Sequence, residues 1–289
     1  MQNVDDPTFR GTGSGFIYHI VRNLSAGLGL PLLLLTLVSV GYSLYRRERG
    51  DGLLAAFALP YYVLIGLAAV KYARYDIPLL PILALWNGRL LADGFRLTRP
   101  RLRENAKWAA VSVLLLTFWY TSLLIGPMSE VDVRDRALNQ VETLPEHQTV
   151  AFASQPWFST PPLSPYFSMP KPGGWREFTS PEVRERIVYE GKDWDRDLLK
   201  ARRPDAVVVT EYDYADTLRQ KNPIVLEYLR VLHRDYSMHY ANIYPFNPIV
   251  LFDLLSPGDS ALPEQGLPHD MLYTNPYIII YQRKPAPIP

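Results

Sequence analysis

The chain has 289 residues and a formal net charge of +1, from 30 basic and 29 acidic side chains. Such a balance excludes the broad basic surface that binds nucleic acid, so no nucleic-acid partner is expected. The complete lack of cysteine excludes disulfides, thiolate metal sites and cysteine nucleophiles. Apolar stretches gather in the first part of the chain and charges in the rest, which predicts a membrane part followed by a water-soluble domain.

Residues 1–23 are predicted to form an extracytoplasmic segment that ends in an interfacial helix. The segment carries Asp5 and Asp6 and lacks a basic start followed by an apolar core, so it is not a signal peptide. Apolar residues recur at helical spacing over residues 16–23, which is typical of a helix lying in a membrane surface. The glycine-rich residues 11–15 lack the Lys-Ser/Thr ending of a phosphate-binding loop, which favours a linker.

Residues 24–129 are predicted to be a transmembrane region. A helix of about 20 apolar residues crosses a hydrocarbon core of about 30 Å. The third of the apolar stretches is short before Arg89, but this side chain can snorkel to the interface while the apolar run continues. The predicted spans cover residues 24–45, 53–70, 77–93 and 108–128.

The basic residues of the short loops predict the orientation, since Lys and Arg are retained on the cytoplasmic side. Two loops are rich in them, one after the first span and one between the third and fourth. Their basic residues are Arg46, Arg47, Arg49, Arg89, Arg96, Arg99, Arg101, Arg103 and Lys107. The predicted location is therefore the inner (plasma) membrane, crossed several times, with the N-terminal segment and the C-terminal domain extracytoplasmic.

Residues 130–289 are predicted to form a small extracytoplasmic α/β domain, so the fold class is a membrane all-α region with about four helices followed by α/β. The pattern predicts helices over residues 131–144, 181–188, 193–201 and 223–233, and strands over residues 149–154, 206–210, 236–244 and 277–281. Prolines and glycines crowd residues 155–175, which predicts a long irregular loop.

Two groups of side chains in this domain have two interpretations each. Glu211, Asp213 and Asp216 follow a predicted strand, where carboxylates bind a sugar or a metal in some α/β folds, but Asp213 and Asp216 also suit a helix cap. Aromatic residues of the proline-rich loop, including Trp157 and Phe158, either stack on carbohydrate or pin the loop to the domain. The five histidines have no metal-ligand spacing, and no metal site is predicted.

The segment Lys71-Tyr72-Ala73-Arg74-Tyr75-Asp76 places two cations and two tyrosines at a membrane boundary, on the side expected to be poor in positive charge. One interpretation is a site for an anionic lipid headgroup, in which Arg74 offers a bidentate fork, Lys71 a point charge and the tyrosines hydrogen bonds. The other is an aromatic belt with snorkelling cations and an ion pair between Arg74 and Asp76.

The segment Tyr72-Ala73-Arg74-Tyr75, running into Ile77-Pro78-Leu79-Leu80-Pro81-Ile82-Leu83-Ala84, resembles a late extracytoplasmic loop and helix of bacterial GT-C glycosyltransferases. These are the family 39 and protein-mannosyltransferase types, with the aminoarabinose lipid A transferases as relatives. The stretch from Tyr18-His19 through Pro31-Leu32-Leu33-Leu34 to Arg46-Arg47 is similar to the segment before that loop. With a last helix and an extracytoplasmic α/β domain, the chain resembles the C-terminal portion of such an enzyme.

The resemblance implies transfer of a sugar from a polyprenyl-phosphate donor to a glycan, lipid or protein, with membrane lipid as a further partner. It places Arg74, with Lys71 and Tyr75, near the lipid phosphate of the donor. Tyr72, His19 and Trp157 are expected on the substrate side.

The acidic catalytic residue of the family lies in a first extracytoplasmic loop that has no counterpart here. No catalytic residue and no cofactor is therefore predicted in this chain, although a divalent metal is possible in the complete enzyme. The chain alone is expected to be inactive. The alternative is a non-catalytic membrane-anchored module that recognises a glycan or another protein.

Overall fold

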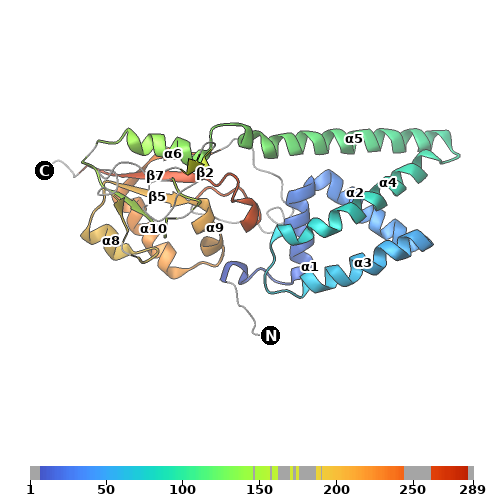
Figure 1. Ribbon diagram of the computed structural model, residues 1–289, viewed down its shortest axis with the longest axis horizontal. Helices are drawn as coiled ribbons and strands as arrows, with labels where there is room; N and C mark the ends of the chain where they lie inside the picture. The colour runs from blue at the N-terminus through green and yellow to red at the C-terminus, as the bar shows by residue number, and fades with distance from the viewer. Residues whose placement is uncertain are drawn as a thin grey trace. The chain divides into compact units, whose positions relative to one another are not determined.

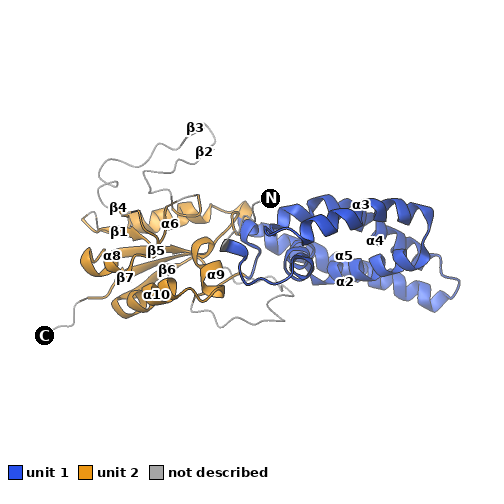
Figure 2. Ribbon diagram, turned by 90° about the horizontal axis from the view of Figure 1, so that it is seen from below, with its two compact units in different colours: residues 1–127, 246–258, 266–271 blue, residues 128–245, 259–265, 272–289 orange. Residues whose placement is uncertain are grey.

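The chain divides into two compact units (Figure 2). The computed structural model describes residues 7–145, 147–156, 158–161, 170–171, 174–175, 187–189, 191–243 and 262–285. Unit 1 comprises Met1–Pro127, Phe246–Gly258 and Gly266–Met271, and unit 2 comprises Met128–Pro245, Asp259–Gln265 and Leu272–Pro289. A short C-terminal segment therefore belongs to the unit built by the start of the chain.

The regular secondary structure among the described residues of unit 1 is helical (Figure 1). Its elements are η1 (Pro7–Phe9), α1 (Gly15–Tyr18), η2 (His19–Leu24), α2 (Ser25–Arg46), α3 (Arg49–Gly66), η3 (Ala73–Leu79), α4 (Leu80–Phe95), α5 (Pro100–Ile125), η4 (Gly126–Ser129) and η5 (His269–Met271). Of these, η2 is a π-helix and η1, η3, η4 and η5 are 3₁₀-helices. The predicted interfacial helix is helical, but it continues through η2 directly into α2.

The α2 helix is kinked near its start by Gly29 and Pro31. Gly29 has φ +71°, and a Cβ there would lie 2.9 Å from the ring of Tyr120. Only glycine suits this backbone conformation and this close approach. Pro31 cannot donate a hydrogen bond within the helix, which also favours a kink. The Tyr120 hydroxyl donates to the Ala26 carbonyl at 2.6 Å, so α5 fastens the kinked segment.

Polar side chains join α2 to α4 inside unit 1. Ser39 donates to the Asn87 side-chain oxygen at 2.6 Å, and the Asn87 amide donates to the Thr36 hydroxyl at 2.9 Å. All three residues are buried. Hydrogen bonds of this kind between helices are typical of packing in membranes, where association gains little from the hydrophobic effect.

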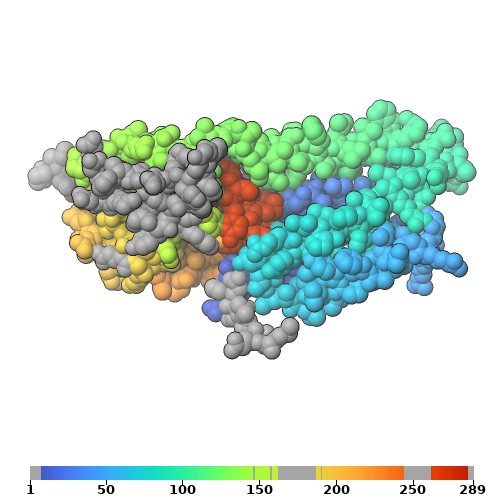
Figure 3. Space-filling view, viewed as in Figure 1, coloured from blue at the N-terminus to red at the C-terminus, as the bar shows by residue number. Residues whose placement is uncertain are grey.

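Many large apolar side chains of unit 1 remain on its outside. On the face seen in the space-filling view, side chains of α3 (blue), α4 (cyan) and α5 (green) lie at the surface of this unit (Figure 3). Leu53, Leu64, Phe118 and Trp119 are between 60% and 76% exposed. Apolar exposure on this scale indicates that the helices contact another apolar phase or a partner.

Two helical stretches, Gly15–Arg46 and Pro100–Glu142, are long and apolar enough to cross a membrane, by length and composition. They contain the first and fourth predicted spans. The α3 and α4 helices, which contain most of the second and third predicted spans, are not among them, and their crossing stays a prediction.

Unit 2 combines a five-stranded sheet with helices. Its elements are α6 (Val133–Glu142), β1 (Val150–Phe152), β2 (Pro170–Lys171), β3 (Gly174–Trp175), β4 (Ile187–Val188), α8 (Arg196–Ala201), β5 (Ala206–Thr210), α9 (Glu211–Arg219), α10 (Pro223–Asp235), β6 (Tyr236–Ala241) and β7 (Ile278–Arg283). The sheet order is β4-β1-β5-β7-β6, with β4, β1 and β5 parallel and β7 and β6 antiparallel.

The sheet of unit 2 is covered on both faces. One hydrophobic cluster packs side chains of α8, α9 and α10 against the sheet, and a second packs α6 against it. All five residues of β5 are buried, as expected of a central strand with a continuous β-branched run. The expected α/β character of this part of the chain is confirmed.

One predicted helix of unit 2 is wrong where it can be compared. Residues 181–188 were expected to be helical, but Ile187 and Val188 form strand β4, paired in parallel with Val150 and Ala151. Two consecutive apolar residues are compatible with a short edge strand as well as with the apolar face of a helix, so the pattern does not distinguish the two. Residues 181–186 lie outside the described residues.

Candidate functional site

The residues singled out at the predicted membrane boundary lie on one connection of unit 1, between α3 and α4. This connection ends α3 after Gly66 and enters the 3₁₀-helix η3 at Ala73. Pro78 lies inside η3 and cannot donate a backbone hydrogen bond, and the following α4 begins at Leu80 with a proline in its first turn. The sequence thus sets a short, stiff turn that carries Arg74 and Tyr75.

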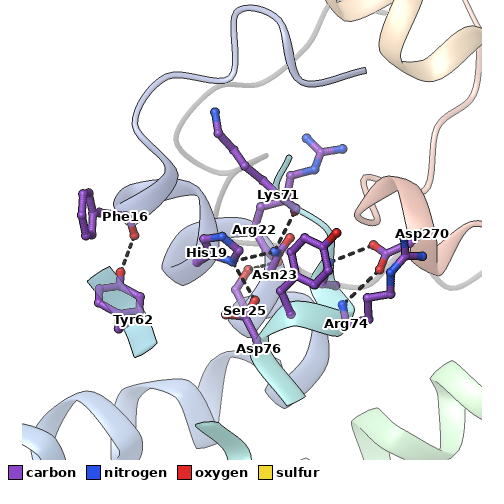
Figure 4. A network of polar contacts seen from close by, with 12 residues as sticks. Phe16, His19, Arg22, Asn23, Ser25, Tyr62, Lys71, Arg74, Asp76 and Asp270 are labelled. Carbon is purple, nitrogen blue, oxygen red and sulfur yellow. Dashed lines mark hydrogen bonds and ion pairs between the residues drawn. The ribbon is translucent and has the colours of Figure 1, made fainter. Parts of the chain in front are cut away.

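The π-helix η2 holds both ends of this connection (Figure 4). His19 Nδ1 lies 3.0 Å from Asp76 Oδ2, and the Asn23 amide donates to the Lys71 carbonyl at 3.0 Å. His19 is 0% exposed and Asn23 is 2% exposed. The two side chains are four residues apart, one helical turn, so they point from the same face of η2. Short π-helical segments are frequent at functional sites.

Lys71 points into unit 1. Its ammonium donates to the Thr12 hydroxyl and to the Gly13 carbonyl, both at 2.7 Å, and lies 5.6 Å from the centre of the Tyr18 ring. The glycine-rich residues 11–15 therefore bind a lysine through their oxygen atoms, which contradicts their reading as a phosphate cradle and agrees with a linker fixed in place. Lys71 is 7% exposed, so its charge is largely shielded from solvent.

A remote segment of the chain, Gly266–Met271, completes the site. The carboxylate of Asp270 accepts hydrogen bonds from the backbone N–H of Ala73 at 2.9 Å and of Arg74 at 3.0 Å. These N–H groups open the η3 helix and have no partner within it, so the carboxylate caps the helix. Arg22 of η2 donates to the Leu267 carbonyl at 3.1 Å, which fastens the same segment from another side.

Arg74 presents its guanidinium at the surface of this pinned turn. The Cζ atom lies 4.1 Å from the centre of the Tyr72 ring and 5.7 Å from that of Tyr75. The residue is exposed, and no carboxylate among the described residues forms an ion pair with it. Asp76, the partner expected if the segment were an ordinary aromatic belt, is instead bound to His19.

The rings around Arg74 form a small aromatic group. Tyr72 and Tyr75 meet edge to face at 5.9 Å, and His269 of η5 lies 6.3 Å from Tyr72. The backbone carbonyl of Tyr75 accepts a hydrogen bond from the Tyr61 hydroxyl of α3 at 2.9 Å. A guanidinium resting on aromatic faces keeps its N–H groups available at the edge, a geometry suited to a phosphate.

The structure thus brings His19, Lys71, Tyr72, Arg74 and Tyr75 to one place, in different roles. Arg74 is exposed and the two tyrosines are half-buried, whereas His19 and Lys71 are buried and hold the turn. Trp157 lies outside the described residues. Among the described ranges, no group of three or more His, Asp or Glu side chains is placed to hold a metal ion.

The carboxylates singled out in unit 2 belong to helix α9. Asp213 and Asp216 both lie inside α9, so neither is its N-cap, which is Thr210. Asp213 accepts a hydrogen bond from the Thr210 hydroxyl, and Asp216 pairs with Arg219 at 2.8 Å. Burial raises the pKa of Glu211 to about 7, partly offset by hydrogen bonds that it accepts from Gln265 and Tyr277.

Comparison with known proteins identifies no matching family model, no matching curated protein and no matching solved structure. The function must therefore be argued from the site itself.

Removing Asp270 tests whether the remote segment holds the Arg74 turn. In Asp270→Ala, the amides of Ala73 and Arg74 lose their acceptors. Hydrogen bonds to a charged group contribute about 1.5–3 kcal/mol, so exchange of these amides is expected to accelerate roughly tenfold or more. Hydrogen-exchange mass spectrometry of peptides covering residues 71–79 measures this. Asp197→Ala, which removes an exposed carboxylate of unit 2, serves as the control; equal protection in the two variants would contradict the assignment.

Proposed function

We propose that this chain is the C-terminal part of an integral-membrane glycosyltransferase that uses a polyprenyl-phosphate-linked sugar donor, and that Arg74 binds the lipid phosphate. The observation that supports this most is an exposed guanidinium without a carboxylate partner among the described residues, on a turn fixed from η2 and from Gly266–Met271. The fixed backbone of the turn holds the guanidinium of Arg74 in one orientation. Two parallel N–H groups of a guanidinium can donate to two oxygen atoms of one phosphate.

Arg74 is the principal phosphate ligand in this proposal. The ammonium of Lys71 already binds Thr12 and Gly13. Lys71 therefore holds the turn in place and attracts the phosphate only through its charge, without direct contact. Tyr72 and Tyr75 support the guanidinium through their ring faces and provide contacts at headgroup depth. No catalytic step is assigned to this chain.

The membrane placement belongs to the same proposal. All four of α2, α3, α4 and α5 cross, with the η3 turn and unit 2 on the extracytoplasmic side. Exposed apolar side chains on these helices and buried hydrogen bonds between α2 and α4 support it. The Arg-rich loops then lie in the cytoplasm, in agreement with the retention of positive charge there.

Ion pairs tie together the ends of α2, α3 and α4 that this orientation places in the cytoplasm. Arg46 pairs with Glu48 and Asp93, and Arg89 pairs with Glu48 and, at 3.4 Å, with Asp51. Arg89 lies within α4, but its guanidinium reaches acidic side chains at the start of α3, in keeping with its expected snorkelling.

Direct binding of undecaprenyl phosphate by the full chain, in lipid nanodiscs and read by native mass spectrometry, tests the proposal. Loss of a charge-assisted bidentate contact costs about 1.5–3 kcal/mol, so Arg74→Ala is expected to weaken binding roughly tenfold to a hundredfold. Arg74→Lys should bind with intermediate affinity, because it keeps the charge and loses the fork.

Two controls make the result specific. Arg96→Ala removes another exposed arginine of unit 1, one on the opposite side of the membrane in the proposed orientation, and should leave binding unchanged. Undecaprenol, which has the same chain without the phosphate, should bind weakly to wild type and equally to Arg74→Ala. Equal affinity of wild type and Arg74→Ala for undecaprenyl phosphate would refute the phosphate site.

A non-catalytic module that recognises a glycan or a protein remains the second candidate function. It is favoured by the contacts among Phe158, Tyr212 and Tyr273 at one edge of the unit 2 sheet. It predicts equal binding of undecaprenyl phosphate and undecaprenol.

A further inference from the structure

A second site is indicated at one edge of the unit 2 sheet. Strand β1 lies between β4 and β5, and all three run parallel. The chain leaves β1 for β4 on one side and then crosses to β5 on the other. In open α/β sheets, ligands bind at the carboxyl ends of strands where the strand order reverses in this way.

Three aromatic side chains meet at this edge. Phe158 follows β1, Tyr212 follows β5, and Tyr273 precedes β7, the antiparallel neighbour of β5. The Phe158 ring centre lies 5.0 Å from that of Tyr212 and 4.5 Å from that of Tyr273, and the two tyrosine rings are 4.9 Å apart. All three side chains are partly buried, so they combine a fixed position with solvent contact.

Hydroxyl groups accompany these rings. The Tyr212 hydroxyl donates to the Tyr273 hydroxyl at 2.8 Å. Ser154 and Ser159, which follow β1, are 7% and 1% exposed, and neither hydroxyl has a hydrogen-bond partner within the described part of the chain. A buried hydroxyl without a partner costs about 1–3 kcal/mol, which a ligand with its own hydroxyl groups would recover.

The charged groups near this edge are already paired. Arg134 at the start of α6 donates to the Tyr273 carbonyl and pairs with Asp132 at 2.8 Å. Glu211 is enclosed and accepts hydrogen bonds from Gln265 and Tyr277. Among the described residues, these charged groups are therefore already engaged, and the edge offers a ligand ring faces and hydroxyl groups.

We propose that this edge binds a neutral carbohydrate, with a sugar ring against Phe158, Tyr212 and Tyr273 and its hydroxyl groups bonded to the tyrosines and to Ser154 and Ser159. A pyranose presents an apolar face of C–H groups and a rim of hydroxyl groups, and these match the two kinds of side chain. The inference goes beyond the donor-phosphate site and does not depend on it, because Arg74 lies in the other unit.

Saturation-transfer NMR on the full chain tests this inference, with maltotriose, mannotriose and chitotriose as probes. The chain is held in lauryldimethylamine oxide, since glucoside and maltoside detergents carry competing sugars. Saturation transfer to at least one trisaccharide is expected from wild type. No transfer to any of the three would overturn the proposal.

Variants locate the binding. Phe158→Ala and Tyr273→Ala each remove a ring, and each is expected to weaken binding roughly tenfold. Tyr212→Phe keeps the ring and removes its hydroxyl, and a severalfold loss is expected from this change, which disturbs packing least. Tyr240→Phe makes the same change on β6 and should bind as wild type does.

Undiminished binding in both Phe158→Ala and Tyr273→Ala would place the sugar elsewhere and refute the site. The Arg74→Ala variant separates this outcome from failure of the donor-phosphate proposal, because it should bind trisaccharides normally while losing undecaprenyl phosphate.

Discussion

Unit 2 is expected to lose about 3 kcal/mol of its free energy of unfolding as the pH rises from about 4.5 to about 7, through the carboxyl group of Glu211. This side chain is 0% exposed. Burial raises its pKa from 4.5 to about 7, the nearby charge of Glu264 adds to the rise, and hydrogen bonds from Gln265 and Tyr277 oppose it.

The sign follows from which state holds the proton. Between pH 4.5 and 7 the folded chain keeps Glu211 protonated while the unfolded chain has already released its proton. The unfolded state then binds fewer protons, so stability falls with rising pH across this window. Above the folded pKa both states are ionised, and this contribution to the slope vanishes.

Hydrogen exchange of the buried amides of β7 in the full chain, corrected for intrinsic exchange, measures this stability. Glu211→Gln cannot ionise and should remove the decline between pH 4.5 and 7. It should also be less stable than the wild type at low pH by about 1–3 kcal/mol, because its amide presents donors to the N–H groups of Gln265 or Tyr277. Glu227→Gln on α10 controls for loss of an acidic residue; a wild-type slope in Glu211→Gln would contradict the prediction.

The central elements of unit 2 were predictable because the local sequence of each one favours a single type of secondary structure. The β-branched run Ala206–Thr210 is buried on both faces and forms β5 as expected. Helix α10 begins at the expected Pro223, with Asn222 accepting a hydrogen bond from the Ile224 amide as N-cap. Strand β4 escaped prediction because two residues at a sheet edge carry too little periodicity to distinguish strand from helix.

The Arg74 turn was predictable in part. Cations and tyrosines beside an apolar run made this segment a candidate site from its sequence, and the structure does place Arg74 against the ring of Tyr72. The inward direction of the Lys71 side chain could not be predicted from the sequence, because it depends on where the fold places Thr12 and Gly13. Asp270 lies 196 positions from Arg74, and no local pattern signals a contact over that separation.

Breaking the buried pair between His19 and Asp76 is expected to destabilise unit 1 by about 3–5 kcal/mol, since removal of one partner leaves the other buried without its hydrogen bond. Asp76 Oδ1 and His19 Nε2 have no hydrogen-bond partner among the described residues, so only the Asn23 amide, 3.1 Å from His19 Nδ1, would still contact the histidine ring. Asp76→Ala should therefore lower the thermal midpoint of the chain in nanodiscs. Asp76→Asn should lower it less, because its side-chain oxygen still accepts from His19 Nδ1.

The same change should reach the proposed phosphate site, because Asp76 lies two residues after Arg74 in η3. A released turn no longer aims the guanidinium, so Asp76→Ala is expected to weaken undecaprenyl phosphate binding although it removes a negative charge. Simple electrostatics predicts the opposite, tighter binding of the phosphate.

His19→Ala combined with Asp76→Ala should destabilise unit 1 little more than either change alone, as for residues acting as one unit. Additive losses would show that the two side chains act separately, and unchanged binding in Asp76→Ala would show that the turn does not need this pair to present Arg74. Glu104→Ala on α5 is the matched control for loss of a carboxylate.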